Sequence, residues 1–414
     1  MRTILKTFVR GGIPVISPIS FLPERQPAGN RPLQLKRVLL GAVVTAVCAS
    51  AIALGILKKG MLVFSTDKMG PLTVIVPLFG AGLVIAMLRI RSGNLRILLQ
   101  PLMVFVAVIT GTPLGHDGVV TSLGKVLRDG MRKGLPQAKE REIVAVAGLA
   151  AGVAALFGTP LAALFLVVEL LLTELTLTSI LPVVLGVAIG GGLHYLYDEW
   201  ALMSVVSADV PSLLGYLVMG LFIGLFATLA ERVQAGLRFL FEKIPANRSW
   251  LTLVVAALVI GISIFYIPEL AGAPFEDIDK LFDGHVTLSF LVILGLIKLV
   301  LAMLSIAAGV PGGSMLPLMT SGGALGMLLI LLIQWAMPSL HLDMMIGVLA
   351  GMAAMLAGGL RILPAAVLLI IELTHEPDLL GPVICASAAS YLVVFLLARK
   401  KGVLREADIK ASMN

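Results

Sequence analysis

Apolar residues follow one another along nearly the whole chain, in runs that glycine, proline and a few polar residues interrupt. A bilayer core about 30 Å thick takes about 20 helical residues, so only some of these runs can cross it. The shorter runs have to be buried in protein or face a water-filled cavity. The pattern therefore predicts an all-α polytopic membrane protein with tilted, broken and re-entrant helices, as in a channel or transporter. The clearest runs cover residues 38–57, 71–87, 97–110, 143–172, 180–196, 213–229, 251–267, 286–308, 315–333, 344–356 and 364–397, of which 143–172 and 364–397 are long enough for two helices each.

The composition supports this class, because 58% of the 414 residues are hydrophobic, 13% are charged and the mean hydropathy is +1.03. A soluble protein of this size has no interior large enough to hide that much apolar surface. The 43 glycines allow helices to approach closely in lipid. Cys48 and Cys385 both lie in apolar runs, so neither a disulfide framework nor a metal site is indicated, and no cofactor is expected.

The charges predict the orientation in the membrane. The formal net charge is +7, and basic residues gather at both ends and at 125–141 and 232–248. The positive-inside rule then places both termini in the cytoplasm, with residues 1–36 as a cytoplasmic N-terminal segment of a protein of a bacterial inner or plasma membrane. No nucleic-acid-binding motif accompanies the basic clusters, so we assign them to topology and lipid headgroups. The polar connections near 202–211 and 268–285 are expected outside the membrane.

The two halves of the chain carry the same pattern. AGLAAGVAALFGTPLAALFLVVEL at 147–170 matches AGMAAMLAGGLRILPAAVLLIIEL at 350–373 without a gap, at an offset of 203 residues. GTPLGHD at 111–117 matches GVPGGSM at 309–315, at an offset of 198. Small apolar residues are common in membrane helices, so the first match, taken by itself, is open to explanation by chance. Two matches in the same order favour an internal repeat. In transporters built this way, broken helices meet near the bilayer midplane and the binding site lies between the halves.

The repeat therefore predicts a membrane domain in two parts. The first repeat is expected to cover residues 37–205 and the second residues 206–399, with residues 400–414 as a cytoplasmic tail.

Each repeat contains a glycine-rich helix start at the matching place. The first N–H groups of a helix and the positive end of its dipole form a site for an anion. Neither stretch carries Lys or Arg, so partial charges alone hold the ion, and it can leave again. We expect the anion-binding backbone at Gly115, His116, Gly118, Gly312, Gly313, Ser314, Met315 and Leu316.

Asp117 stands at the first of these helix starts. Its carboxylate can occupy the anion's own position as a tethered competitor, which protonation would release, and an ionisable residue inside a membrane is a functional candidate. His116 beside it is a candidate for tuning the proton affinity. The competing interpretation is that Asp117 is an inert N-cap, since Asp is a favoured capping residue.

At these residues the sequence resembles the CLC family of chloride channels and proton-coupled chloride antiporters. The family signature of Gly, basic residue, Glu, Gly, Pro is similar to residues 115–119, and its Gly-x-Phe-x-Pro signature is similar to residues 313–317. The resemblance implies a CLC-like inverted repeat of about 18 helices. It also implies a homodimer with one pore per subunit, and it places Asp117 where the family has its external gating glutamate.

The sequence departs from the family pattern at several positions. Asp is one methylene shorter than Glu, Met315 replaces the phenylalanine, and Leu170 falls where the family has its internal proton-transfer glutamate. These departures leave the anion open between chloride, fluoride or another small anion, and they favour a channel or a weakly coupled transporter.

The family's pore serine and tyrosine have no clear match. Further candidates for the missing hydroxyl and proton groups are Ser92, Glu169, Glu174 and Tyr391. Glu169 has the competing interpretation of a structural carboxylate, because its repeat partner Glu372 occupies the matching position. Lys298 and Arg361, inside apolar runs, are expected to be structural partners of buried acids.

We expect transport of small anions, chloride first, with protons as a further partner. A second interpretation is a cation- or proton-coupled transporter in which Asp117 binds Na⁺ or H⁺ for symport of another solute. Helix N-termini at the site favour an anion and C-termini a cation. An intramembrane enzyme is disfavoured, because no HExxH, no Gly-x-Ser-x-Gly and no Cys/His cluster supplies catalytic chemistry.

Overall fold

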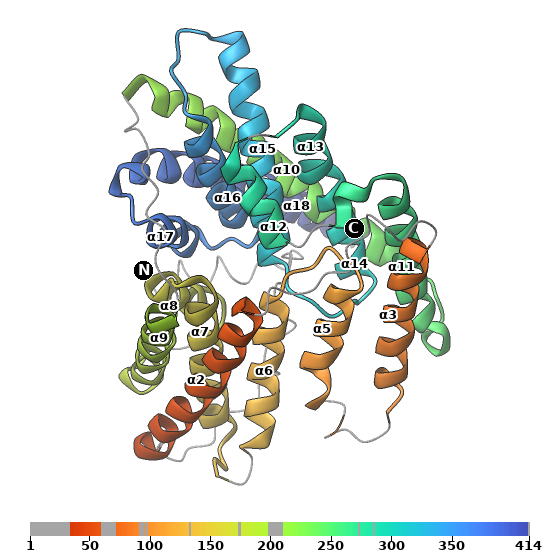
Figure 1. Cartoon of the computed structure of the whole chain (residues 1–414), viewed down its shortest axis with the longest axis vertical. Helices are drawn as coiled ribbons and strands as arrows, with labels where there is room; N and C mark the ends of the chain where they lie inside the picture. Colours follow the sequence, from red (N-terminus) through yellow and green to blue (C-terminus); the bar gives the residue numbers. More distant parts are fainter. Residues whose placement is uncertain are drawn as a thin grey trace.

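The computed structural model describes residues 34–58, 72–90, 95, 98–131, 134–172, 175–197, 210–271, 274–284 and 286–412. These residues form helices joined by turns (Figure 1), and the one pairing of extended backbone among them is an isolated bridge. The all-α prediction is confirmed.

The described helices mix long and short apolar segments, as the hydrophobic pattern predicted. Six segments are long and apolar enough to cross a bilayer: Leu35–Gly55, Leu177–Leu196, Pro211–Glu242, Leu288–Ala307, Met315–Ala336 and Pro377–Ala398. Others are shorter, and one of these, Met344–Gly359, has almost all of its side chains buried in protein. Burial suits it, because a helix too short to span lipid needs protein around its ends.

The first half of the described chain runs from α2 to α9. Both helices predicted within 143–172 are present, as α7 and α8, separated by Gly158 in the left-handed conformation. The bounds are α2 Leu35–Lys58, α3 Leu72–Leu88, α5 Gln100–Ile109, α6 Asp117–Gly130, α7 Ala138–Phe157, α8 Pro160–Leu170 and α9 Leu177–Tyr197.

The second half runs from α10 to α18. The run 364–397 again gives two helices, α17 and α18, and α18 continues through most of the predicted tail. The bounds are α10 Val210–Glu242, η2 Ala246–Arg248, α11 Trp250–Tyr266, η3 Pro268–Ala271, α12 Pro274–Asp283, α13 Leu288–Val292, η4 Ile293–Ile297, α14 Lys298–Ala307, α15 Met315–Ala336, α16 Met344–Gly359, α17 Leu363–Thr374, η5 Pro377–Leu379 and α18 Leu380–Ser412.

The two halves repeat one another at the predicted offsets. Helix α14 begins and ends 198 residues after α5, and α15 begins 198 residues after α6. Gly111 and Gly309, which match at this offset, both have positive φ, at 93° and 81°. Gly158 and Arg361, which match at an offset of 203, do so too, at 70° and 61°. The added residues of the second copy lengthen α15, which has 22 residues where α6 has 14.

The repeats are inverted. In Figure 1, α6 runs from the middle of the molecule to its lower end, whereas α15 runs from the middle to the upper end. Matching helices also meet across the halves, because α8 packs against α17, which begins 203 residues later. Because the repeats are inverted, α6 and α15 both begin near the centre of the molecule and run in opposite directions.

The segment 268–285, which is expected to lie outside the membrane, contains regular structure. Most of its described part is helical, as η3 and α12, and α12 packs against α15. Its apolar side chains Ile278 and Leu281 are buried, as is Asp277, which binds Lys298 of α14. The acidic and apolar residues of α12 are spaced as in an amphipathic helix. The overall polar composition of the segment did not indicate this helix.

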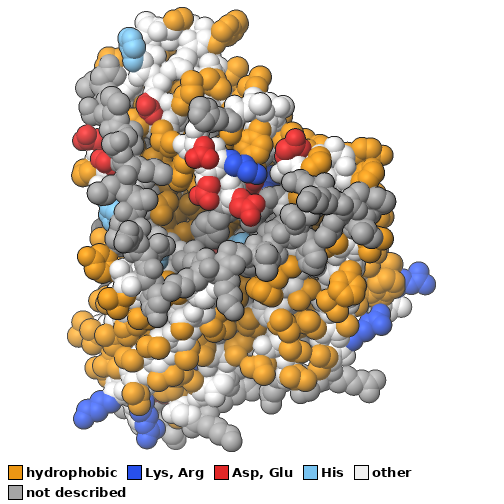
Figure 2. All heavy atoms as spheres, viewed as in Figure 1, with side chains coloured by type: hydrophobic (Ala, Val, Ile, Leu, Met, Phe, Trp, Pro, Cys, Tyr) orange, Lys and Arg blue, Asp and Glu red, His pale blue; other side chains and the backbone are white. Residues whose placement is uncertain are grey.

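Both basic residues of the apolar runs have acidic partners, as predicted. Lys298 pairs with Asp277, and Arg361 pairs with Glu231 of α10 through Nη2, 3.1 Å from Oε1. Figure 2 shows most of the visible lysines and arginines in the lower half of one face of the molecule, at its lower left and right edges, and the acids in the upper half.

Candidate functional site

The site lies where the two matching glycine-rich segments meet. Gly115 donates its N–H to the Gly313 carbonyl at 2.8 Å, and Gly313 donates to the Gly115 carbonyl at 3.1 Å, which makes an antiparallel bridge. Helix α6 begins two residues after Gly115, and α15 begins two residues after Gly313. The predicted convergence of the two helix starts is therefore observed.

Glycine is required at this junction because the backbones almost touch. A side chain on Gly118 would overlap the backbone of Gly312 and Gly313. A side chain on Gly313 would overlap the Asp117 carboxylate. Any larger residue at these positions has to push the two halves apart, or displace the acid between them.

Asp117 bridges the two halves. It belongs to α6, and its Oδ2 accepts a hydrogen bond from the Met315 N–H, the first amide of α15, at 3.1 Å. The side chain is 1% exposed, and Oδ1 has no hydrogen-bond partner. A carboxylate in this position takes up an α15 amide that a free anion would otherwise use.

The other predicted residues of the junction are also largely shielded from solvent. His116, Ser314, Met315 and Leu316 are all buried, and Gly312 is half-buried. Residues 111–119 and 309–317 contain no Lys or Arg. The favourable potential for an anion therefore comes from amides and from the two helix dipoles.

Two further carboxylates lie at helix starts, across the seam between α8 and α17. Glu372 of α17 accepts hydrogen bonds from Leu161 N at 2.9 Å and Ala162 N at 2.7 Å, the first free amides of α8. At the matching place, the Glu169 carboxylate of α8 lies near the Ala365 amide of α17, and its Oε2 is buried without a hydrogen bond. This reciprocal arrangement supports the interpretation of Glu169 as a structural carboxylate.

Glu169 also has a polar neighbour on α18. Tyr391 lies within electrostatic range of Glu169 and of Arg361, so two of the further candidates are brought together. They gather at the start of α17 rather than at the starts of α6 and α15. Ser92 and Glu174, the other two, lie outside the described residues.

Glu372 gives a prediction on stability. Glu372→Gln keeps the shape but removes the charge, and we expect the free energy of unfolding to fall by about 1–2 kcal/mol, because the α8 amides lose a charged acceptor. Thermal unfolding in detergent measures this, with Asp378→Asn, a change at an exposed acid of η5, as the matched control. Equal melting temperatures for the two variants would contradict the capping role.

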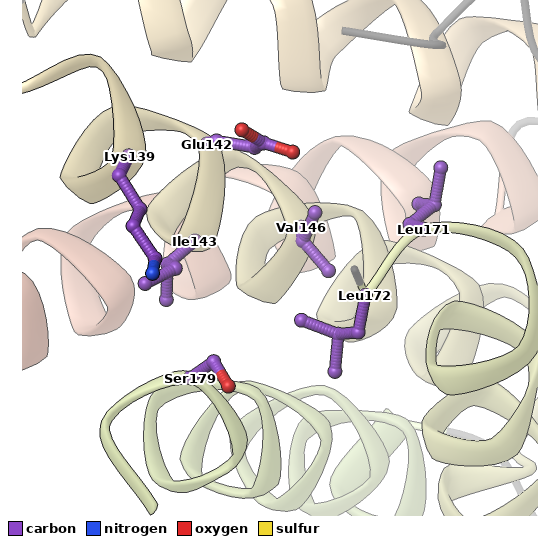
Figure 3. A pocket seen from close by; sticks show the side chains of 7 residues that line it. All are labelled: Lys139, Glu142, Ile143, Val146, Leu171, Leu172 and Ser179. Carbon is purple, nitrogen blue, oxygen red and sulfur yellow. The ribbon is translucent and has the colours of Figure 1, made fainter. Parts of the chain in front are cut away.

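A pocket lies away from the α6–α15 junction, between the start of α7, the end of α8 and the start of α9 (Figure 3). Lys139, Glu142 and Ser179 surround apolar side chains there, and it contains none of the predicted site residues. Within the described residues, no three His, Cys, Asp or Glu side chains gather where they could hold a metal ion.

Comparison with known proteins agrees with this geometry. Residues 80–394 match the family described as voltage gated chloride channel. A slow cyanobacterial Cl⁻/H⁺ antiporter of known structure is 17% identical, with a TM-score of 0.73 over 91% of this chain and 99% of the antiporter. A CLC-type fluoride/proton antiporter is 20% identical, with a TM-score of 0.72 over 88% of this chain and 97% of the other. A eukaryotic CLC transporter is 19% identical, with a TM-score of 0.67 over 90% and 74%.

Proposed function

The chain belongs to the voltage gated chloride channel family, and from this premise we propose that it carries small inorganic anions, chloride first, through a pore where α6 and α15 meet. Members of this family are integral multi-pass transport proteins and not enzymes. The observation that carries the proposal is the contact between the Asp117 carboxylate and the first amide of α15.

Asp117 is the proposed gate. While it is ionised, its carboxylate competes with the anion for the Met315 amide. Protonation removes the charge and weakens the hydrogen bond, because an amide binds an ionised acceptor more strongly than a neutral one. The neutral side chain can then swing away, and an anion takes its place among the amides of the two helix starts.

Proton coupling is proposed to be weak or atypical. Leu170 carries no proton where the family has its internal glutamate, and Glu169 beside it faces the start of α17. The structural neighbours described as proton antiporters share the fold, and their coupling is a property of those proteins.

A cation-coupled transporter is the less favoured function. Its binding site would need helix C-termini and their carbonyls, whereas α6 and α15 both present N-termini to the junction. The direction of these helices therefore favours an anion.

We also propose that both termini face the cytoplasm of a bacterial inner or plasma membrane, and that the protein is a homodimer. The lysines and arginines in the lower half of the face in Figure 2 support this orientation through the positive-inside rule. Exposed apolar side chains on α8, α9 and α18, among them Phe165, Leu181 and Ile384, suit a partner subunit as well as lipid. Native mass spectrometry of the protein extracted with lipid measures the subunit number, and a monomer would overturn the dimer.

Flux from liposomes tests the proposed function. The purified protein is reconstituted, and the efflux of chloride and fluoride is recorded together with external pH. We expect anion efflux above that of empty liposomes, with few protons moved for each anion. A fixed proton-to-anion ratio would overturn the weak coupling, and absence of efflux of either anion, at pH 7 and at pH 5, would overturn the function.

A further inference from the structure

Ser314 has an unusual place at the start of α15. It is the N-cap residue, where a serine ordinarily accepts a hydrogen bond from an amide in the first turn. Ser314 does not do so, because its backbone has φ −107° and ψ −10°. Thr287 and Asp343, the N-caps of α13 and α16, have extended backbones and do accept such bonds, from Phe290 N at 3.3 Å and Ile346 N at 3.0 Å.

The Ser314 hydroxyl is also buried without a partner. The side chain is 2% exposed, and Oγ has no hydrogen bond. Comparable buried hydroxyls on the neighbouring helices return to a carbonyl of their own turn, as Ser122 does to Val119 O at 2.7 Å and Thr320 to Pro317 O at 3.0 Å. A buried hydroxyl without a partner is destabilising, because its desolvation is not compensated, so it calls for a functional explanation.

The residues next to Ser314 indicate what kind of acceptor its hydroxyl would bind. Ser314 lies between Met315, whose N–H binds Asp117 Oδ2, and Gly313, where a side chain would overlap the same carboxylate. Asp117 Oδ1 is equally buried and without a partner. Thr159 and Ser387 are the other buried hydroxyls without a hydrogen bond among the described residues, and neither belongs to this junction.

We propose that the Ser314 hydroxyl is a hydrogen-bond donor to the transported anion, and that it selects for small monatomic anions. The inference rests on the proposed function of the junction, and adds a side-chain donor to its backbone amides. The hydroxyl can rotate toward whatever acceptor replaces the Asp117 carboxylate. The hydroxyl contributes more to the affinity for a compact anion such as fluoride or chloride than for a diffuse one such as thiocyanate. The reason is that the Coulomb attraction between the hydroxyl hydrogen and the anion's charge grows as their separation falls.

The test measures anion binding where the carboxylate no longer competes. Chloride and thiocyanate are titrated by calorimetry into purified Asp117→Ala protein, alone and combined with Ser314→Ala, Ser314→Thr or Ser122→Ala. Ser314→Ala is expected to weaken chloride binding about tenfold or more and thiocyanate binding about threefold or less. Ser314→Thr keeps the hydroxyl and is expected to stay within about threefold for both anions. Ser122→Ala removes a buried hydroxyl that has its own partner, and is expected to change neither affinity.

Two results would overturn the inference in different ways. In the first, adding Ser314→Ala to Asp117→Ala leaves the affinity for both anions unchanged, or weakens both equally while Ser314→Thr also weakens them. Either outcome would show that the hydroxyl is not a selective donor. The anion site itself then stands. If the Asp117→Ala protein binds neither anion and liposomes containing it release none, the proposed function fails, and the inference fails with it.

Discussion

Asp117→Ala is expected to raise anion flux at neutral pH about tenfold or more, and to make that flux nearly independent of pH. The change deletes the competitor at the Met315 amide. A hydrogen bond to a charged acceptor contributes about 1.5–3 kcal/mol, and about 1.4 kcal/mol corresponds to a factor of ten. The anion then enters without waiting for protonation.

The wild-type protein is expected to show the pH dependence that Asp117→Ala removes. Its flux should increase as pH falls, because protonation neutralises the carboxylate and weakens its hold on α15. Asp117→Asn, a neutral side chain of the same shape, is expected to be as insensitive to pH as Asp117→Ala. Chloride efflux from liposomes between pH 5 and pH 8 measures all three proteins, with Asp378→Asn as an exposed control. A steep pH dependence that survives in Asp117→Ala would remove Asp117 as the gate.

The largest expected loss of stability comes from Lys298→Met. Lys298 is 1% exposed and its partner Asp277 is 0% exposed, so the substitution leaves a buried carboxylate without its cation. Breaking such a pair is destabilising by about 3–5 kcal/mol, because the desolvated charge is no longer compensated. Thermal unfolding in detergent should show a clear fall in melting temperature, with Lys280→Met, on the exposed face of α12, as the control.

A double variant separates the ion pair from simple packing. Asp277→Leu combined with Lys298→Met replaces both charges by apolar groups, and is expected to recover most of the lost stability. A double variant no more stable than Lys298→Met alone would show that the pair is needed for shape rather than for charge balance.

The sequence predicted much of this architecture because glycine, proline and apolar runs act locally. The match of GTPLGHD to GVPGGSM placed the starts of α6 and α15 correctly, since helix starts depend on nearby residues. The repeat predicted that the two helix starts converge, whereas the backbone bridge between Gly115 and Gly313 is known only from the structure.

The sequence could not predict which hydrogen-bond donors and acceptors pair with one another at the site. Asp117 binds an amide 198 residues away, and Glu372 binds amides 211 and 210 residues away. Such pairings depend on how whole helices pack, and no periodicity encodes them. Ser314 was expected to act through its backbone, because nothing in the sequence indicates that its hydroxyl lacks the usual capping bond.

The two repeats carry the same acid where α8 and α17 meet, but different residues at the junction of α6 and α15. Glu169 and Glu372 are symmetry mates, whereas the mate of Asp117 is Met315. Two identical halves would put an acid at both positions, and like charges that close oppose each other's ionisation. Because these two residues differ, the two halves contribute differently to the proposed anion path: the first half contributes the Asp117 carboxylate, and the second contributes the Met315 amide that binds it.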